Sequence, residues 1–245
     1  KPGDIIGEEQ IRRRIELIKP HTDWVRSFSC IEGNELVPRI AKEYGMKTLV
    51  GAWLGEDTEK NEQEIEGLIK LANEGLVDVA AVGNEVIYRK EMSEEELIAY
   101  IHRVKKAIPE IPVGYVDAYY EFSHRPNITE ACDVILANCY PFWEGCHIDY
   151  SFMYMKQMYY EALDAAKGKR VIITETGWPS DGGGFEGSRA GNINFLKYFI
   201  DAQIWSDEED IEMFYFSSFD ESWKTGDEGD VGAHWGIWVK NENLK

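Results

Sequence analysis

Two glutamates, Glu85 and Glu175, stand out because each comes at the end of an apolar run. In the stretch AAVGNEVIYR, residues 80–89, the run ends in Gly83 and is followed at once by Asn84 and Glu85. Glu175 follows a second such run, RVIIT. Cleavage of a glycosidic bond requires a pair of carboxyl groups: one protonates the leaving oxygen, and the other attacks the anomeric carbon or activates water. A single strand-end glutamate is more often structural, so the hypothesis depends on the pair.

The elements that would position these glutamates alternate between apolar strand-like runs and amphipathic helical stretches. Nearly continuous apolar runs are typical of parallel strands that are covered on both faces. Repeated strand–helix units indicate a parallel α/β sheet with right-handed crossovers, which fits either a doubly wound sheet or a closed barrel. We predict strands at residues 24–29, 47–53, 78–82, 112–118, 133–139, 170–174 and 212–218.

Capping residues and apolar spacing predict the helices between these strands. The link of residues 118–131 is too short for a full helix, and we expect one turn there. The predicted helices are residues 8–19, a helix capped by Asn34 and ended by Gly45, a helix capped by Asn61 and ended by Gly75, a helix that starts at a Ser93–Glu96 capping box, and helices around Met155 and Phe195.

The number of strands favours a (β/α)8 TIM barrel over the doubly wound alternative. The chain opens with a helix and shows seven strand-like runs, whereas a closed barrel of this kind needs eight strands. The simplest interpretation is a single catalytic barrel domain over residues 1–245, whose first strand lies upstream of Lys1 and is missing from this chain. Catalytic groups of such barrels lie at the carboxyl ends of strands. Counted in this way, Glu85 ends strand four and Glu175 ends strand seven, and we expect them to face one another across the barrel mouth.

The other strand ends supply aromatic and charged residues that could bind or support a sugar. Aromatic side chains there could stack on sugar rings, although packing against a loop is an equal alternative for Trp178 and Trp223. The candidates besides the two glutamates are Arg26, Trp53, Asn84, Tyr115, Tyr140, Trp143, Trp178, Glu221 and Lys224.

The composition argues against several other classes of function. The formal net charge of −19 makes nucleic acid and anionic membranes poor partners, whereas a neutral polymer would not be repelled. The four cysteines form no CxxC pair, and Gly182–Gly184 lacks the spacing of a phosphate-binding loop, so we expect no metal and no cofactor. The sequence contains neither a signal peptide nor an apolar run of membrane-spanning length.

Several motifs resemble glycoside hydrolase family 17, the β-1,3-glucanases. These are VGNEV at 82–86, ITETGWPS at 173–180 and FDESWK at 219–224. The tail DEGDVGAHWGIW at 227–238 is similar to the microbial branch of that family. The resemblance runs from about Arg13 to Trp238, and the octapeptide around Glu175 is its most specific part.

The resemblance implies a (β/α)8 barrel that hydrolyses β-1,3-glucans such as laminarin with retention of configuration. It makes Glu85 the general acid/base and Glu175 the nucleophile. It implies further that Asn84 binds the sugar 2-hydroxyl, Tyr140 lies close to the nucleophile, Arg26 supports the nucleophile's carboxylate, Glu221 and Lys224 form an ordering pair, and Trp143 and Trp178 are sugar platforms.

Three alternatives stay open beside an endo-β-1,3-glucanase. The same site could be a β-1,3-glucanosyltransferase, or it could cleave another β-glucan. A non-catalytic glucan-binding barrel would usually lack one glutamate, and this sequence has both. The expected partner is a β-1,3-glucan polysaccharide or oligosaccharide, bound by a monomer in an extracellular, periplasmic or cell-surface location, in which the chain could be one domain of a larger protein.

Overall fold

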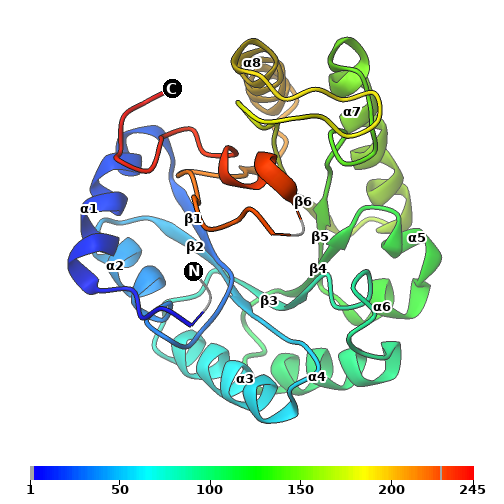
Figure 1. Ribbon diagram of the computed structural model, residues 1–245. Coiled ribbons are helices and arrows are strands. Elements are labelled where there is room, and N and C mark those ends of the chain that lie inside the picture. The colour runs from blue at the N-terminus through cyan, green and yellow to red at the C-terminus, as the bar shows by residue number, and fades with distance from the viewer. Residues whose placement is uncertain (1–2, 227) are drawn as a thin grey trace. The chain divides into compact units, whose positions relative to one another are not determined.

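The computed structural model describes residues 3–226 and 228–245 (Figure 1). Asp227, the first residue of the tail motif, lies outside the described residues. The chain divides into two compact units. The N-terminal unit runs up to Leu136 and includes Ala165–Arg170, and the C-terminal unit comprises Ala137–Asp164 and Val171–Lys245.

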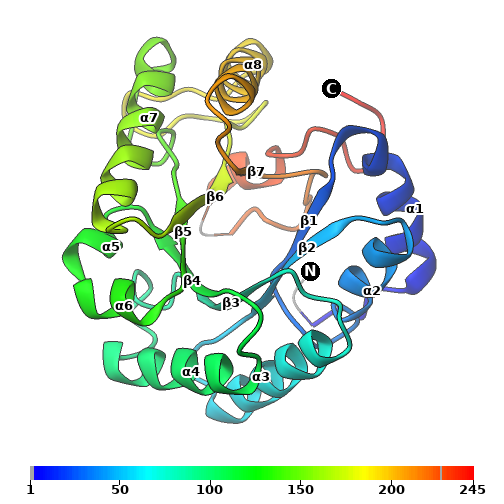
Figure 2. The same ribbon diagram turned by 180° about the vertical axis from the view of Figure 1, so that it is seen from behind.

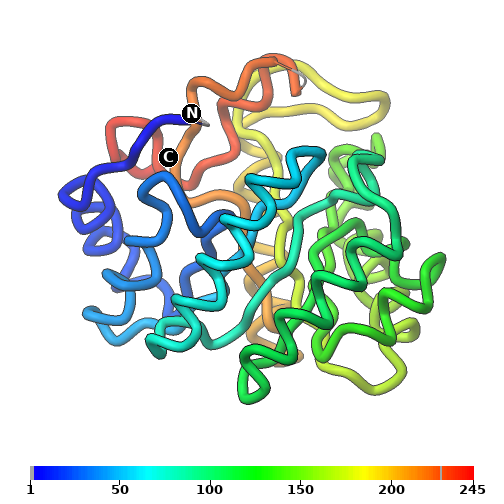
Figure 3. Tube along the Cα trace, turned by 90° about the horizontal axis from the view of Figure 1, so that it is seen from below, coloured from blue at the N-terminus to red at the C-terminus, as the bar shows by residue number. Residues whose placement is uncertain are grey.

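The N-terminal unit is built on parallel strands with helices on their outer side, as Figure 1 shows. Its strands are β1 (Trp24–Ser27), β2 (Lys47–Ala52), β3 (Val79–Asn84) and β4 (Val113–Ala118). Helices α3 and α4 pack side by side (Figure 3). The helices are α1 (Glu8–Ile18), the 3-10 turn η1 (Lys19–His21), α2 (Leu36–Glu43), α3 (Thr58–Asn73), α4 (Glu94–Ala107), α5 (Glu121–His124) and α6 (Pro126–Ala131).

The C-terminal unit repeats the strand–helix alternation (Figure 2). Strand β6 (Arg170–Thr176) pairs in parallel with β7 (Met213–Tyr215). An ion pair of 2.7 Å between Asp149 and Lys197 joins helix α7 (Ile148–Ala165) to helix α8 (Asn192–Glu208), and Lys156 of α7 pairs at 2.8 Å with Glu209, which directly follows α8. Strand β5 (Val134–Asn138) lies where the two units divide, and the 3-10 turn η2 (Gly229–Ala233) follows β7.

The predicted fold class, a (β/α)8 barrel, is confirmed. Seven strands are arranged in chain order, and helices separate them. Within the described residues no strand precedes α1. The apolar faces of strands and helices form the core, in which fully buried side chains such as Leu49, Ile65, Val79 and Ile135 come from β2, α3, β3 and β5.

The structure corrects several local predictions. Asp57, rather than Asn61, caps α3, because its side chain accepts the Lys60 N–H at 3.1 Å. Asn61 is buried within the helix and binds both backbone groups of Gly55. Helix α2 begins after Glu35 rather than Asn34. The link after β4 holds two short helices, α5 and α6, instead of one turn. The Ser93–Glu96 capping box of α4 is confirmed.

Candidate active site

Glu85 lies in a turn that leaves strand β3 in a left-handed conformation. Gly83 has φ +84° and Glu85 has φ +55°. The pairing of β3 with β4 shifts in register between Ala81 and Asn84, and the Glu85 N–H then donates to Val116 O at 2.8 Å. A positive φ is uncommon outside glycine and is kept only where the surroundings fix it. A specific turn, rather than the regular pleat of a strand, therefore sets the position of Glu85.

Asn84 is held in place by two arginines. Arg26 Nη2 donates to Asn84 Oδ1 at 2.7 Å, and Arg89 Nη1 donates to the Asn84 carbonyl at 2.6 Å. Asn84 is only 7% exposed. The Arg26 guanidinium binds Asn84 Oδ1 and so fixes which way the amide points. The amide donor, Nδ2, is the group that can donate to a sugar hydroxyl. The structure thus brings two predicted site residues, Arg26 and Asn84, together beside Glu85.

Trp53 is a sugar-platform candidate that the structure leaves accessible. It follows β2 and is 39% exposed. The Arg89 guanidinium lies 4.8 Å from the centre of one of its rings, and Arg89 is itself paired with Glu91 at 2.8 Å. A cation–π contact of this kind fixes the indole without covering all of it. The sequence analysis did not single out Arg89. It is the last residue of the stretch AAVGNEVIYR, four residues after Glu85, and this position could have marked it as a candidate.

Tyr115 does not present a ring to solvent, which corrects its inclusion among residues that could stack on a sugar. It lies in β4 and is fully buried. Its hydroxyl accepts the Ile87 N–H at 3.0 Å and donates to Asp117 Oδ2. Tyr115 therefore supports the turn that carries Glu85.

Glu175 lies inside strand β6, whereas the sequence predicted it just after the strand. It is 7% exposed, and its carbonyl accepts the Cys139 N–H at 2.8 Å. The Tyr140 hydroxyl donates to Glu175 Oε2 at 2.8 Å. A hydrogen bond to a charged acceptor is among the stronger ones in proteins. Tyr140 thus lies where the prediction placed it, at the carboxylate of the candidate nucleophile.

A cluster of aromatic rings surrounds Tyr140. Its ring centre is 5.5 Å from that of Trp235 and 6.3 Å from that of Phe216. Trp235 also contacts Phe142 at 5.5 Å and Trp143 at 5.6 Å. We call these five residues the aromatic cluster. Sequence reasoning missed Trp235, which is buried, although it lies within the quoted tail motif.

The two tryptophans predicted as sugar platforms differ in exposure. Trp143 is half-buried at the edge of the aromatic cluster and stays a candidate. Trp178 is fully buried, its Nε1 donates to the Arg189 carbonyl at 2.9 Å, and its ring packs on Phe142 and Tyr198. The platform role of Trp178 is therefore wrong, and its packing alternative holds.

Glu221 and Lys224 form the predicted pair on the loop after β7. Lys224 Nζ lies 3.8 Å from Glu221 and 3.1 Å from Glu228, and it sits 4.4 Å from the ring centre of Phe216. Since Phe216 contacts Tyr140, the loop that carries this pair is attached to the aromatic cluster.

Within the residues that the structure describes, no group of three or more His, Cys, Asp or Glu side chains could hold a metal ion. No helix there combines the length and apolar character needed to cross a membrane.

Comparisons with known proteins agree with these features. The chain matches the BtgE/BtgC glycoside hydrolase domain over residues 2–236. A glucan 1,3-beta-glucosidase of Arthroderma benhamiae is 27% identical, over 99% of this chain and 85% of that protein. Two structures of a Rhizomucor miehei β-1,3-glucanosyltransferase of family 17, one an active-site mutant with laminaritriose, are 31% identical over 98% of this chain and 90% of theirs, with TM-scores of 0.90 and 0.89. The chain therefore belongs to glycoside hydrolase family 17 and carries a BtgE/BtgC glycoside hydrolase domain.

Proposed function

We propose that the chain is a retaining endo-β-1,3-glucanase in which Glu85 is the general acid/base and Glu175 the nucleophile. The observation that carries this proposal is the buried Glu175 carboxylate with the Tyr140 hydroxyl on Oε2. The substrate class is supported by the relatives named glucan 1,3-beta-glucosidase and by the laminaritriose complex of the Rhizomucor enzyme.

In the first step, the Glu85 carboxyl donates its proton to the glycosidic oxygen as the bond to the anomeric carbon breaks. The Glu175 carboxylate attacks that carbon and forms a glycosyl–enzyme ester. Tyr140 holds the attacking carboxylate by donating to Oε2. Asn84, fixed by Arg26, offers its Nδ2 to the sugar 2-hydroxyl, where a hydrogen bond strengthens in the transition state.

In the second step, the Glu85 carboxylate takes a proton from water, and the hydroxide attacks the anomeric carbon and releases Glu175. Two inversions give net retention of configuration. Trp53 and Trp143 are the platforms on which we place sugar rings. Glu221 and Lys224 order the loop after β7 in this scheme.

A second candidate, β-1,3-glucanosyl transfer, is favoured by the 31% identity to the Rhizomucor transferase. It uses the same first step, and a sugar hydroxyl replaces water in the second. Product profiles on laminari-oligosaccharides over time separate the two. Hydrolysis gives only shorter products, whereas transfer gives products longer than the substrate. Mixed-linkage glucan as a parallel substrate tests the linkage preference.

Variants of the two glutamates test the catalytic assignment. We expect Glu175→Gln and Glu85→Gln each to lower kcat on laminarin by about 10²-fold to 10⁴-fold or more without loss of folding. Added azide should convert an activated β-glycoside to the β-glycosyl azide with Glu85→Ala and to the α-glycosyl azide with Glu175→Ala. Glu62→Gln, a change at an exposed carboxylate on α3, is the matched control. Near-normal turnover by Glu175→Gln would contradict the assignment, as would a crystallographic carboxyl separation near 9 Å instead of about 5 Å.

A further inference from the structure

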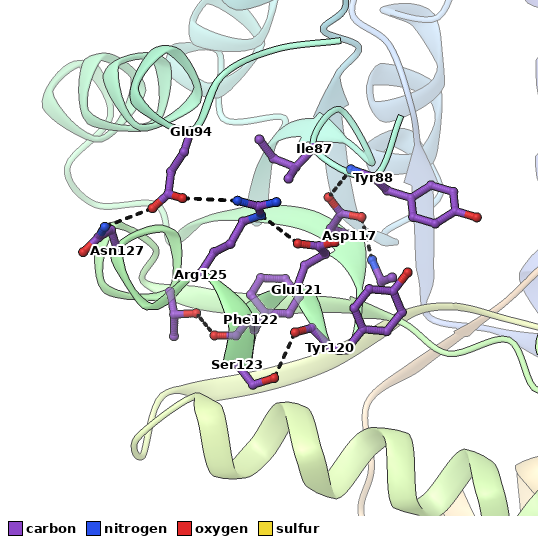
Figure 4. A network of polar contacts seen from close by, with 12 residues as sticks. Ile87, Tyr88, Glu94, Asp117, Tyr120, Glu121, Phe122, Ser123, Arg125 and Asn127 are labelled. Carbon is purple, nitrogen blue, oxygen red and sulfur yellow. Dashed lines mark hydrogen bonds and ion pairs between the residues drawn. The ribbon is translucent and has the colours of Figure 1, made fainter. Parts of the chain in front are cut away.

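Strand β4 carries a buried carboxylate, Asp117, for which the proposed mechanism has no use. The residue is fully buried. Its Oδ1 accepts the Ala118 N–H at 2.8 Å, and its Oδ2 accepts both the Tyr88 N–H at 3.3 Å and the Tyr115 hydroxyl. Figure 4 shows Asp117 directed toward the backbone of Tyr88. A buried carboxylate is costly unless hydrogen bonds compensate it, so this arrangement needs a reason.

The hydrogen bonds of Asp117 belong to a set that fastens one turn to one strand. Three backbone N–H groups of residues 85–88 donate to β4. Glu85 donates to the Val116 carbonyl at 2.8 Å, Ile87 to the Tyr115 hydroxyl at 3.0 Å, and Tyr88 to Asp117 at 3.3 Å. Asp117 takes part in this set directly and also through Tyr115, whose hydroxyl it orients.

The turn needs such fastening because its backbone is strained. Glu85 has a positive φ, which is uncommon for a residue other than glycine, and the strand pairing shifts in register between Ala81 and Asn84. Residues in such conformations relax unless neighbouring groups hold them. Without its acceptors on β4, the turn could move, and the Glu85 carboxyl would move with it.

The charge of Glu121 acts on Asp117, and Glu121 begins a short chain of ion pairs. The pKa of Asp117 is raised to about 6, mainly by burial and also by the charge of Glu121, while hydrogen bonds from Tyr115, Ala118 and Tyr88 act in the opposite direction. Glu121 is paired with Arg125 at 2.8 Å, and Arg125 lies 3.5 Å from Glu94 on α4 (Figure 4). On the turn side, burial is the main cause that raises the pKa of Tyr115, and the charges of Asp117 and Glu85 add to it.

We propose that Asp117 is a positioning residue for the acid/base Glu85: it fixes the turn of residues 85–88 through the Tyr88 N–H and the Tyr115 hydroxyl. This inference rests on the proposed function, in which Glu85 delivers the proton to the leaving group. Asp117 contacts neither the substrate nor Glu85 in this scheme, and it acts through the backbone between them.

The test exploits the leaving group of the substrate. A poor leaving group, as in laminaritetraose, needs the proton from Glu85, whereas the dinitrophenolate of 2,4-dinitrophenyl β-laminaribioside leaves without it. We expect Asp117→Ala and Tyr115→Phe to lower kcat/KM on laminaritetraose by about 10²-fold and on the aryl glycoside by less than about threefold. Asp117→Asn, which keeps an oxygen acceptor for Tyr115, should recover part of the loss on laminaritetraose.

Two controls and a second test variant make the outcomes distinct. Glu85→Ala must itself show the leaving-group dependence, and if it does not, the proposed role of Glu85 fails. If Glu85→Ala shows the dependence but the Asp117 and Tyr115 variants lose equal activity on both substrates, or none on either, the positioning role is overturned. Glu121→Gln changes a charge near Asp117 but leaves the turn's acceptors in place, and we expect both substrates to be cleaved at normal rates. Tyr115→Phe keeps the test decisive should Asp117→Ala fail to fold.

Discussion

The two candidate catalytic glutamates are held by opposite means, each within its own unit. Glu85 lies in a turn with positive φ, and hydrogen bonds to the acceptors of β4 hold its backbone. Glu175 lies in a regular strand, and its side chain accepts a hydrogen bond from the hydroxyl of Tyr140, whose ring packs against Trp235. The first arrangement fixes the backbone, and the second fixes the carboxylate itself.

The difference fits the two proposed roles. A nucleophile must stay aligned with one carbon atom, and a hydrogen bond from a tyrosine that is itself packed among aromatic rings restricts the position of its carboxylate. An acid/base must first give a proton to a sugar oxygen and then take one from water, so it needs room at its carboxyl group. The hydrogen bonds to β4 described above act on the backbone of residues 85–88 and not on the Glu85 carboxyl group itself. Substitutions should therefore harm the Glu175 region through packing and the Glu85 region through polar contacts.

The largest expected effect on stability is in the aromatic cluster, at Trp235. Truncation to alanine removes a buried indole that contacts four other rings, and we expect the free energy of unfolding to fall by about 3–5 kcal/mol. Urea denaturation followed by circular dichroism measures this change. Trp235→Phe is the control. It keeps a ring in place and removes a buried Nε1 that has no hydrogen-bond partner within the described residues, so its loss should be less than half as large. If Trp235→Phe and Trp235→Ala lowered the free energy of unfolding equally, ring packing would not be the source of the stabilisation.

The next effect is a pH dependence of stability in the Glu85 region. Burial raises the pKa of Asp117 from its ordinary 3.8 to about 6 in the folded state. The folded protein thus binds more protons than the unfolded chain between these values. The stabilisation is fully present below the ordinary pKa and is lost as pH rises through about 6, by up to about 3 kcal/mol.

Urea denaturation from about pH 4 to about pH 7 should show this decline in the native chain. In Asp117→Asn, whose side chain does not titrate, the slope over this interval should be shallower. Comparison of slopes, rather than of absolute stabilities, removes the effect of the altered hydrogen bonds. Identical slopes in the two proteins would mean that Asp117 does not titrate in this window.

These two regions also differ in how well the sequence predicted them. The order of strands and helices followed from apolar periodicity, and both glutamates followed from their place at strand ends. The turn of Glu85 was indicated by Gly83, since glycine before a polar pair signals a change of backbone direction. The contribution of Asp117 was not visible, because it depends on the pairing of β4 with β3, which no local pattern encodes.

The aromatic cluster could not be assembled from sequence at all. Trp178 and Trp143 look alike as strand-end tryptophans, yet one is fully buried and the other is not. Phe142 packs on both rings, whereas Tyr198 of α8 packs on Trp178, whose Nε1 also donates to the Arg189 carbonyl. The predicted end of β6 was also wrong, because the strand continues through Glu175 to Thr176. The Thr176 hydroxyl is hydrogen-bonded at 2.6 Å to the hydroxyl of Tyr198 on α8, a contact between residues distant in the sequence.

A smaller effect is expected on catalysis when the Glu175 region loses one polar contact. Tyr140→Phe removes the hydrogen bond to Glu175 Oε2 and keeps the ring in the aromatic cluster. A hydrogen bond to a charged group contributes about 1.5–3 kcal/mol, so kcat/KM should fall by about 10-fold to 100-fold. Unlike the Asp117 variants, Tyr140→Phe should slow laminaritetraose and the activated aryl glycoside alike, since both need the nucleophile. A loss confined to laminaritetraose would place Tyr140 on the acid/base side instead.

The smallest effect is expected at the exposed edge of the Glu85 region, where Arg89 lies over Trp53. Arg89→Lys keeps a cation but loses the planar group that both stacks on the indole and donates to the Asn84 carbonyl. An exposed cation–π contact contributes about 0.5–1 kcal/mol, so KM for laminari-oligosaccharides should rise by about two- to fivefold with little change in kcat. Arg103→Lys, at an exposed ion pair on α4, is the matched control and should change neither constant. If kcat falls instead while KM stays constant, Arg89 acts on the turn of Glu85 through the Asn84 carbonyl and not on a sugar platform. The hydrogen bonds that position the acid/base would then include Arg89 as well as the acceptors on β4.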